Sequence, residues 1–586
     1  MRGSRRSPDW PGGVIRESDV PCELADGVVL RADIYRRDDG QRRPVLLLRL
    51  PYGKDVAEAN AGFAHPSWYA LQGYVVVVQD VRGCHRSGGV FTPFLHEADD
   101  GVATIGWASR LPFCDGRVIT YGSSYMGMTQ LLAAVRRPPG LVAMAPTFTS
   151  SQAYEGWGYE DGALRLGFVA SWSASIALAQ AERAGDAATA DRLRASLRDP
   201  SALLADFPDA EAHGLTRGLV PWVRDWVEHP ADDEYWQRWR LHGDASSIDV
   251  PALHIAGWYD LFLRGTVRNY QESRDRAGNS RARADQRLVI GPWMHAPLAP
   301  VDPTCQAACN DLDDLQLAWF ASVLDGCEPT LAPVTVWVHG SGWRELDDWP
   351  PPDRGTRTWY LHSGGRAQSR HGDGTLTLDP PRDETADVLI HEPGAPVGSV
   401  GGRSCCLPEI MGPQDQRARE DERNVVVYTS APACEPVDLV GNATLVVFVT
   451  TDAPDASADL VATLGVVDEQ GVSINVQEGI AHAWNDRRGR ASSGGVYEVR
   501  VDLGPVGRRI APGEAIRVTL AASDFPRWDL PGRARGGPRP RVANRATTQL
   551  ILHDTLRPSR VVIDVLAPTD RAAPAMAAPS RSALER

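Results

Sequence analysis

Short and almost continuous apolar runs recur through the first half of this chain, separated by segments with helical periodicity. Runs without polar alternation are typical of parallel strands that are buried on both faces. The helical segments between them predict an α/β sheet with helices on both sides. The expected strands are residues 28–35, 44–50, 74–80, 118–121, 141–145, 252–257 and 288–291. The expected helices are residues 98–108, 125–135 and 311–324.

The regular alternation of apolar strands and helices stops between residues 147 and 245, where the sequence pattern is helical and irregular. The expected helices are residues 163–180, 187–197, 218–227 and 233–241. An insertion of this size between two sheet strands predicts a cap over the carboxyl edge of the sheet. Open α/β sheets bind their ligands at that edge.

Short alternating segments take over after about residue 330, with Gly, Pro and Asp between them. They predict an all-β sandwich, specifically a jelly roll. The expected strands are residues 334–338, 357–361, 424–428, 443–450, 459–467, 497–503, 516–521, 547–552 and 560–565. The predicted organisation is an α/β core (1–146 and 246–328), a helical cap (147–245), a β-sandwich domain (329–567) and a disordered tail (568–586).

Composition and charge narrow the classes of function. The 586 residues are 43% hydrophobic and 23% charged, as in ordinary multidomain globular proteins. A net charge of -14 argues against a nucleic-acid or anionic-membrane partner. We find no run of 18 apolar residues that would span a membrane and no secretory signal at the N-terminus.

The nine cysteines are scattered and odd in number, which predicts free thiols and a cytoplasmic location. Cys305 and Cys309 lack a second ligand pair at zinc-like spacing, so no metal site is expected there.

The segment 122–127, GSSYMG, joins the strand that ends at Tyr121 to the next helix. A serine on such a sharp strand-to-helix turn is the arrangement called a nucleophile elbow. Ser124 stands two residues after Gly122, as that pattern requires. The usual second glycine, two residues after the serine, is replaced by Met126, and the glycine follows at 127.

An activated serine needs a base to accept its proton and a carboxylate to orient that base. Asp260 follows the expected strand 252–257, and His295 follows the expected strand 288–291. Both therefore stand at carboxyl ends of strands, in the order Ser, Asp, His that α/β hydrolases use. These positions predict a catalytic triad of Ser124, Asp260 and His295.

Five stretches resemble the CocE/NonD-type serine hydrolases, a family with bacterial cocaine esterase, glutaryl acylases, α-amino-acid ester hydrolases and X-Pro dipeptidyl-peptidases. They are residues 49–54 (RLPYGK), 79–83 (QDVRG), 122–127 (GSSYMG), 256–260 (AGWYD) and 291–295 (GPWMH). Residues 219–223, 228–233, 412–417 and 524–528 continue the resemblance over nearly the whole chain. The family pattern G-x-S-Y-x-G also accounts for the displaced glycine.

The resemblance implies an α/β-hydrolase core, a helical cap and a C-terminal jelly roll. It implies that Ser124 is the nucleophile, His295 the general base and then acid, and Asp260 its orienting carboxylate. It further implies an oxyanion hole formed by the Tyr125 backbone N–H and the Tyr52 hydroxyl. No metal or organic cofactor is required by this chemistry.

Trp157, Trp172 and Phe262 match positions that line the acyl pocket in the cocaine-esterase branch, although plain core residues would look the same. Cys405 and Cys406 stand where that branch has bulky apolar residues over the pocket, which implies a wider or differently shaped pocket here. The adjacent cysteines form either a strained disulfide or two free buried thiols, and the thiols are favoured.

Substrates with a free α-amino group are disfavoured. Family members that hold a substrate ammonium have acidic residues two and three positions after the triad aspartate, where this chain has Phe262 and Leu263. Glu160 and Asp161 in the cap are acidic, but we expect them to lie in an exposed loop.

The resulting prediction is a serine esterase that cleaves carboxylic esters through an acyl-enzyme. An X-Pro dipeptidyl-peptidase and an amide acylase or acyltransferase of a biosynthetic pathway are alternatives, because they share the triad. A non-catalytic binding protein is a remote alternative. The expected ligand is a small ester or amide, and a homodimer is left open.

Overall fold

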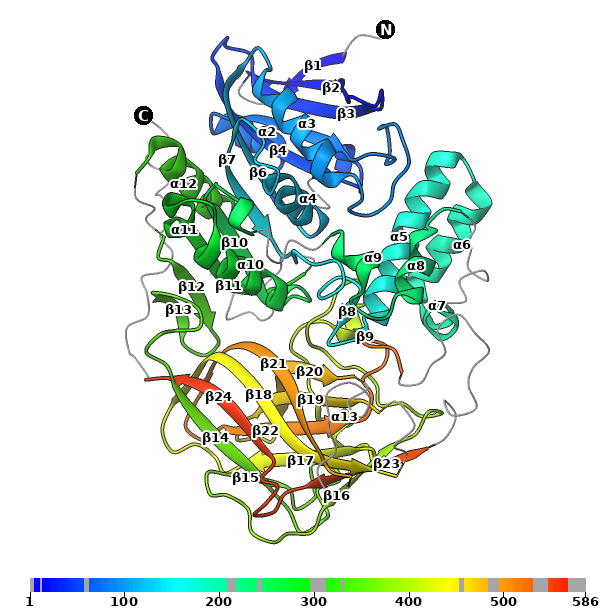
Figure 1. The fold of residues 1–586 in the computed structure, drawn as a ribbon, viewed down its shortest axis with the longest axis vertical. Coiled ribbons are helices and arrows are strands. Elements are labelled where there is room, and N and C mark those ends of the chain that lie inside the picture. Colours follow the sequence, from blue (N-terminus) through cyan, green and yellow to red (C-terminus); the bar gives the residue numbers. More distant parts are fainter. Residues whose placement is uncertain are drawn as a thin grey trace.

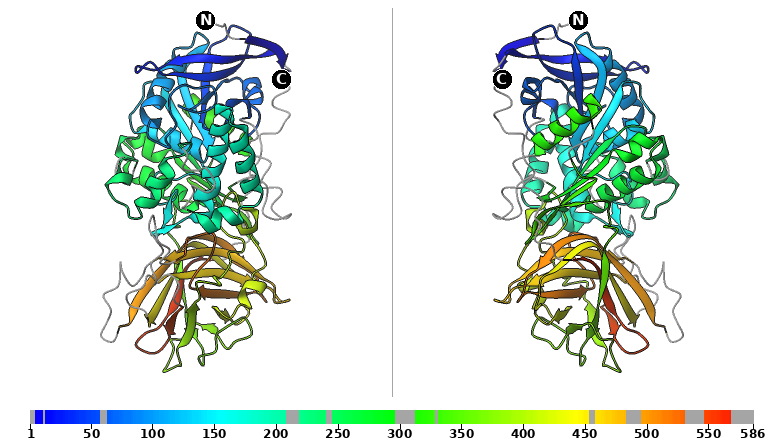
Figure 2. Two further views of the ribbon diagram at one scale, coloured as in Figure 1. Left: turned by 90° about the vertical axis from the view of Figure 1, so that its right-hand side faces the viewer. Right: turned by 90° about the vertical axis from the view of Figure 1, so that its left-hand side faces the viewer.

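The computed structural model describes residues 5–10, 13–56, 63–207, 218–239, 245–295, 312–327, 331–452, 458–482, 495–530 and 546–567. Figure 1 shows a first sheet with its helices at one end, an all-β domain at the other, and a group of helices beside the first sheet. Figure 2 shows from both sides that the all-β domain packs beneath the rest of the molecule. The expected tail (568–586), Cys305 and Cys309 lie outside the described residues.

Within the described residues the first sheet has eleven strands, in the order β1-β2-β3-β5-β4-β6-β7-β10-β11-β12-β13. Neighbours from β5 to β12 are parallel, whereas the pairs β1–β2, β2–β3, β3–β5 and β12–β13 are antiparallel. The strands are β1 (Arg5–Trp10), β2 (Val14–Glu23), β3 (Val29–Arg37), β4 (Arg43–Leu50), β5 (Val75–Asp80), β6 (Cys114–Ser123), β7 (Leu141–Thr147), β10 (Ala252–Tyr259), β11 (Gln286–Met294), β12 (Val334–Val338) and β13 (Gly342–Leu346).

Strand β4 shows why its sequence is apolar without interruption. Val45 and Leu47 pack in one core cluster together with Ile105 of α3, whereas Leu46 and Leu48 pack in another. Successive side chains of a strand point to opposite faces, so both faces of this sheet are covered. The core helices are α2 (Pro66–Leu71), α3 (Glu97–Ser109), α4 (Tyr125–Ala134), α10 (Leu263–Arg276), α11 (Ser280–Ala284) and α12 (Leu312–Asp325), with short turns η2 (Lys54–Val56) and η3 (Ala245–Ser247).

The cap consists of a small hairpin and helices α5 to α9, which Figure 1 shows grouped on one side of the core. Its interior is aromatic: Trp172, Trp222, Trp226 and Trp236 are each at most 4% exposed. Such rings bury a large apolar area with few residues. The elements are β8 (Tyr159–Glu160), β9 (Ala163–Leu164), α5 (Leu166–Ala184), α6 (Ala187–Arg198), α7 (Ser201–Asp206), α8 (Trp222–Glu228) and α9 (Glu234–Gln237).

The C-terminal domain is all-β apart from two short helical turns in the part that the structure describes. Its sheet runs β16-β23-β18-β24-β14-β15-β17-β22-β19-β20, and β21 pairs with β18. The elements are β14 (Gly355–His362), β15 (Thr375–Thr377), β16 (Asp387–His391), η5 (Pro408–Ile410), α13 (Arg417–Glu420), β17 (Val425–Ser430), β18 (Val437–Thr451), β19 (Leu460–Val467), β20 (Ser473–Ala481), β21 (Tyr497–Ile510), β22 (Ala515–Ala521), β23 (Thr547–Leu552) and β24 (Arg560–Leu566).

One strand lies in a different sheet from the one its sequence suggests. The alternation of residues 334–338 predicts a strand of the β domain, but the structure pairs β12 parallel with β11, with Leu288 opposite Val334. Alternation shows that a strand has a buried face and does not identify its partner. In the part of the chain that the structure describes, we find no helix with the length and apolarity needed to cross a membrane.

Candidate active site

Ser124 lies in the tight turn between β6 and α4, with backbone angles φ 60° and ψ -123°. A positive φ is uncommon for a residue with a side chain and is kept only where neighbours enforce it. Here the Ser124 N–H donates to the carbonyl of Thr147 at 2.9 Å, and the Thr149 hydroxyl donates to the Ser124 carbonyl at 2.9 Å. The loop after β7 therefore fixes the serine backbone.

Two glycines make this turn sterically feasible. A Cβ on Gly122, whose φ is 129°, would lie 2.5 Å from Leu48, and a Cβ on Gly127 would lie 2.6 Å from Thr149. These separations are shorter than carbon atoms tolerate. Glycine is needed at position 127 because this residue lies against Thr149, where a side chain would not fit. Met126 occupies the usual glycine position and is fully buried instead.

Asp260 and His295 reach Ser124 from two neighbouring parallel strands. Asp260 follows β10 and His295 follows β11, and these strands are in register at Gly257 and Gly291. The His295 Nδ1 atom lies 2.5 Å from Asp260 Oδ2, and its Nε2 atom lies 3.1 Å from Ser124 Oγ. The structure thus brings the three predicted residues into one hydrogen-bonded chain.

The surroundings of this hydrogen-bonded chain determine how basic the imidazole of His295 is. Asp260 is fully buried, and its second oxygen accepts the Phe262 N–H at 2.6 Å. Burial opposes charging of His295, but the negative charge of Asp260 and its hydrogen bond raise the pKa of His295 above the ordinary value. The imidazole is therefore a stronger base than a free histidine.

Tyr52 and Tyr125 both lie next to Ser124, as expected. The Tyr52 hydroxyl accepts a hydrogen bond from Trp172 Nε1 at 3.0 Å and lies within hydrogen-bonding reach of Ser124. Burial raises the pKa of Tyr52 well above its usual range, so its hydroxyl stays a neutral donor. Tyr125 is the first residue of α4, where a backbone N–H has no partner within the helix.

The side chain of Tyr125 is held by Glu97, which the sequence analysis did not single out, and Glu97 is in turn paired with Arg49. The Tyr125 hydroxyl donates to Glu97 Oε1 at 2.9 Å, and Glu97 pairs with Arg49 at 2.9 Å. Arg49 belongs to the motif that also carries Tyr52. The buried Glu97–Arg49 pair therefore fixes Tyr125, the first residue of α4. No local sequence pattern indicates that these three residues contact one another.

An aromatic wall stands beside His295. The ring of Phe262 lies 5.3 Å from the imidazole and 4.5 Å from Trp157. Trp172 lies 5.9 Å from Trp157. Phe168, which sequence reasoning missed, lies about 6 Å from each of these three rings. Its spacing of four residues from Trp172 on α5 was the available signal.

Cys405 and Cys406 are both free thiols, so the disulfide alternative is not what the structure shows. Cys405 is 6% exposed, as expected for a buried thiol. Cys406 is exposed, and the expectation that it is buried was wrong. Its backbone φ is 72°, in the left-handed region.

Glu160 is also placed differently from the expectation of an exposed loop. It is 2% exposed and contacts Arg165 and Arg264 at 2.9 Å and Arg403 at 3.0 Å. Asp161 contacts Arg264 at 3.4 Å. Three arginines neutralise this carboxylate, which explains how a charged side chain remains buried.

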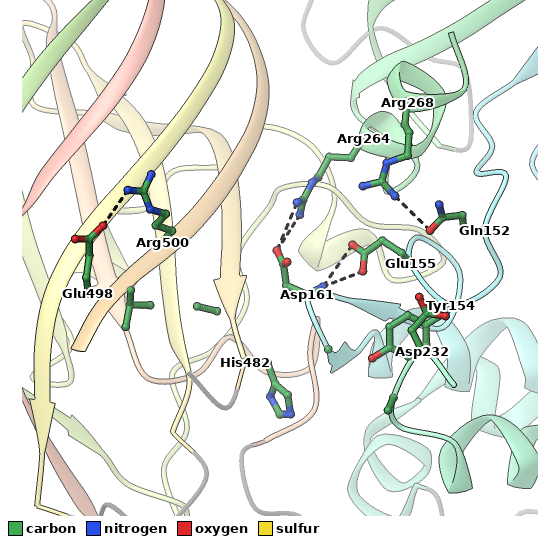
Figure 3. Close-up of a pocket in the computed structure, with 14 residues that line it drawn as sticks. Gln152, Tyr154, Glu155, Asp161, Asp232, Arg264, Arg268, His482, Glu498 and Arg500 are labelled. Atoms are coloured by element: carbon green, nitrogen blue, oxygen red, sulfur yellow. Dashed lines mark hydrogen bonds and ion pairs between the residues drawn. The ribbon is translucent and has the colours of Figure 1, made fainter. Parts of the chain in front are cut away.

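A separate polar cavity of about 680 Å³ lies between the cap, α10 and the β domain (Figure 3). Figure 3 shows Arg264 of α10 paired with Asp161 of the cap and Arg268 of α10 paired with Gln152 at this cavity. The described residues that line it do not include Ser124, Asp260 or His295. It is therefore distinct from the hydrogen-bonded chain at Ser124.

Comparison with known proteins gives matches along most of the chain. The family model described as X-Pro dipeptidyl-peptidase (S15 family) matches residues 26–297. The model described as X-Pro dipeptidyl-peptidase C-terminal non-catalytic domain matches residues 329–562. Cocaine esterase of Rhodococcus sp. (strain MB1 Bresler) is 34% identical over 538 residues, which cover 87% of this chain and 91% of that protein.

Solved structures support the same fold at lower identity. An aminopeptidase from the marine sediment archaeon Thaumarchaeota archaeon has a TM-score of 0.75 at 20% identity, covering 97% of this chain and 98% of that one. An α-amino acid ester hydrolase has a TM-score of 0.77 at 21% identity, covering 96% and 98%. At 20–21% sequence identity, the similarity to these two structures shows that the fold is shared and nothing about activity.

Proposed function

This chain belongs to the serine hydrolase family that contains bacterial cocaine esterase, and from that premise we propose that Ser124, His295 and Asp260 hydrolyse carboxylic esters through an acyl-enzyme. The observation that carries the proposal is the hydrogen-bonded chain itself. Contacts of 3.1 Å from Ser124 to His295 and 2.5 Å from His295 to Asp260 are the distances that proton transfer from a serine requires.

In the first step Ser124 Oγ attacks the ester carbonyl while His295 Nε2 accepts its proton. Asp260 keeps the Nδ1 proton of the imidazole directed toward itself and stabilises the positive charge that develops. His295 then donates the proton to the leaving alcohol oxygen, and an ester on Ser124 remains. Water, deprotonated by His295, attacks that ester and releases the acid.

The negative oxygen formed in each step needs hydrogen-bond donors at a fixed position. The Tyr125 N–H at the start of α4 and the Tyr52 hydroxyl are the donors in this proposal. Trp172 supports it because its indole N–H donates to Tyr52 and thereby leaves the phenolic proton free to point elsewhere. A hydrogen-bond donor that is already oriented does not have to reorganise when negative charge develops on the oxygen, so it stabilises the transition state more effectively.

Phe262, Trp157, Trp172 and Phe168 are proposed to bind the acyl group. They are at most 4% exposed and contact one another, and Phe262 lies 5.3 Å from His295, beside which the carbonyl carbon has to lie. The environment is apolar, and Glu160, the nearby cap carboxylate, is already neutralised by arginines. Apolar acyl groups are therefore preferred over groups with a free ammonium.

The test uses p-nitrophenyl esters of graded acyl size beside an X-Pro dipeptide p-nitroanilide. We expect rapid cleavage of the esters with a preference for apolar acyl groups. Ser124→Ala should lower kcat by about 10⁴-fold or more, since the attacking group is removed. The adjacent Ser123→Ala is the matched control and should retain ester cleavage.

Three outcomes would change this conclusion. A wild-type ester rate in Ser124→Ala would remove Ser124 as the nucleophile. Cleavage of the anilide in preference to the esters, abolished by the same change, would indicate a peptidase. Absence of turnover together with absence of serine labelling by a phosphonate would favour a binding protein.

A further inference from the structure

The polar cavity between the cap, α10 and the β domain is a separate compartment of the molecule (Figure 3). Its volume of about 680 Å³ lies within the range of small-molecule binding sites. Its described lining includes no residue of the triad and no ring of the aromatic wall beside His295. A ligand in this cavity would therefore not occupy the proposed acyl pocket.

Two arginines of α10 reach the wall of the cavity from the same face of the helix. Arg264 and Arg268 are four residues apart, so their side chains lie one above the other. Arg264 contacts Glu160 at 2.9 Å and Asp161 at 3.4 Å, and it also pairs with Asp502 of β21. These carboxylates neutralise the charge of Arg264.

Arg268 lacks such a partner within the part of the chain that the structure describes. Its one hydrogen bond there runs from Nη1 to Gln152 Oε1 at 3.3 Å, and no carboxylate forms an ion pair with it. Glu155 also lines the cavity, but both of its carboxylate oxygens accept the Asp161 N–H, at 3.2 and 3.4 Å. Because a guanidinium has five N–H donors in a planar fork, most donors of Arg268 are available to a ligand.

The other cationic groups of the described lining have acidic partners. Arg500 pairs with Glu498 at 2.9 Å, on the side of the cavity opposite α10 in Figure 3. His482 Nδ1 lies 2.8 Å from an oxygen of Asp459. Among the lining residues that the structure describes, Arg268 is therefore the cation without a carboxylate partner, and it marks where the negative charge of a ligand would bind.

The acidic side chains of the wall limit what the rest of the ligand can be. Besides three arginines, the described lining has the four carboxylates of Glu155, Asp161, Asp232 and Glu498. This excess of negative charge repels a ligand with a second negative charge. Ionised carboxylates accept hydrogen bonds and cannot donate them, so they match a ligand that is rich in hydroxyl groups. One carboxylate together with several hydroxyls is the chemistry of a sugar acid.

We propose that this cavity is a binding site for a polyhydroxylated monocarboxylate of the sugar-acid class. The ligand carboxylate accepts two parallel N–H bonds from Arg268, the geometry in which a guanidinium and a carboxylate fit best. The ligand hydroxyls donate to the carboxylates of the wall. The site does not depend on the proposed function, since neither Ser124 nor His295 lines the cavity.

The test is isothermal titration calorimetry of the full chain with gluconate and with sorbitol, which has the same hydroxylated chain but an alcohol in place of the carboxylate. We expect saturable binding of gluconate at a single site and no measurable binding of sorbitol. Arg268→Gln should weaken gluconate binding about tenfold or more, since it removes a charged donor pair. Arg276→Gln is the matched control, because this exposed arginine lies on the same helix but outside the lining, and it should bind gluconate as the wild type does.

Labelling of the wild-type chain with phenylglyoxal tests the same contact without a substitution. The reagent modifies arginine side chains, and peptide mass spectrometry gives the extent of modification at each of them. Saturating gluconate should slow the modification of Arg268 about tenfold, because the ligand covers its guanidinium in the complex. The modification of Arg276 should not change, and sorbitol should protect neither residue.

Three results would overturn the proposal. They are a wild-type chain that binds no gluconate, an Arg268→Gln variant that binds it as tightly as the wild type, and equal labelling of Arg268 with and without gluconate. If circular dichroism shows that Arg268→Gln is unfolded, the labelling of the wild type decides. Ser124→Ala should bind gluconate with wild-type affinity, so failure of ester cleavage and failure of this site are separate results.

Discussion

At the residue scale, the Tyr52 hydroxyl accepts a hydrogen bond from Trp172 and is the proposed side-chain donor to the oxyanion. Tyr52→Phe removes an oxygen and keeps the ring, so the packing against the cap is retained. If this hydroxyl stabilises the oxyanion, kcat for p-nitrophenyl esters should fall about 10²–10³-fold with a small change in KM. Tyr154→Phe is the control, because its hydroxyl donates to Pro230 in the cap at 2.8 Å. Equal rates in Tyr52→Phe and the wild type would remove Tyr52 from the oxyanion hole.

The raised pKa of His295 predicts where activity is lost in acid. The base must be neutral to accept the Ser124 proton, so kcat/KM should fall as the pH drops through the pKa of His295. Because Asp260 raises that pKa above the ordinary value of 6.5, the midpoint should lie above 6.5. Asp260→Asn should shift the midpoint down and lower the plateau about 10⁴-fold. A wild-type midpoint well below 6.5 would contradict the charged Asp260–His295 pair.

At the scale of elements, the displaced glycine of the elbow is a steric requirement. In Gly127→Ala the new methyl carbon would lie 2.6 Å from Thr149, so the turn has to shift, and the free energy of unfolding should fall by about 1–3 kcal/mol. Gly106→Ala on α3 is the matched control, because its Cβ would meet only the mobile end of Arg110 at 3.3 Å. That change should be neutral or stabilising by about 0.5–1 kcal/mol. Chemical denaturation and ester kinetics of both variants check this, and equal stabilities would refute the steric explanation.

Helices and strands with a clear hydrophobic pattern could be predicted from the sequence, and those without such a pattern could not. Strand β4 and the strand before Ser124 are apolar throughout, and their hydrophobic pattern identifies them. Half of the residues of strand β2 (VIRESDVPCE) are polar because it lies near the sheet edge, and most residues of α10 (LRGTVRNYQESRDR) are polar. Neither was predicted, because their pairing and packing partners stabilise them more than their own sequence pattern indicates.

At the scale of the whole molecule, Glu160 connects all three parts. It lies in the cap hairpin and contacts Arg264 of the core and Arg403 of the β domain. Its third partner, Arg165, donates to the Leu261 carbonyl at 2.9 Å, directly after Asp260. This buried cluster therefore links Arg403 of the β domain to the turn that carries Asp260.

Removing the charge of Glu160 should destabilise this junction. Glu160→Gln leaves the buried Arg165 and Arg403 and the partly buried Arg264 without their shared carboxylate, and the free energy of unfolding should fall by about 3–5 kcal/mol. Glu182→Gln is the control, because its pair with Arg194 is exposed, and it should cost about 1 kcal/mol or less. Urea unfolding at neutral pH measures both, and similar losses in the two variants would contradict the role of the cluster.

The same junction has a defined pH dependence. Burial disfavours the charged form of Glu160, but Arg165, Arg403 and Arg264 lower its pKa far below the ordinary value of 4.5. A carboxylate with a depressed folded-state pKa stabilises the fold above the unfolded value and loses that contribution as the pH falls toward the folded value. The difference in stability between the wild type and Glu160→Gln should therefore be full at neutral pH and decrease below about pH 4.5.

The sequence by itself determined the chemical groups and their order: a serine on a strand-to-helix turn, then an aspartate and a histidine at strand ends. It could do so because a parallel sheet places the carboxyl ends of its strands at one edge. The tertiary structure alone decided that β12 joins the first sheet, that Glu160 is enclosed by arginines and that Cys406 is exposed whereas Cys405 is buried. Those features depend on contacts between residues that are far apart in the chain. A local sequence pattern does not show which of these contacts form or how much they stabilise the fold.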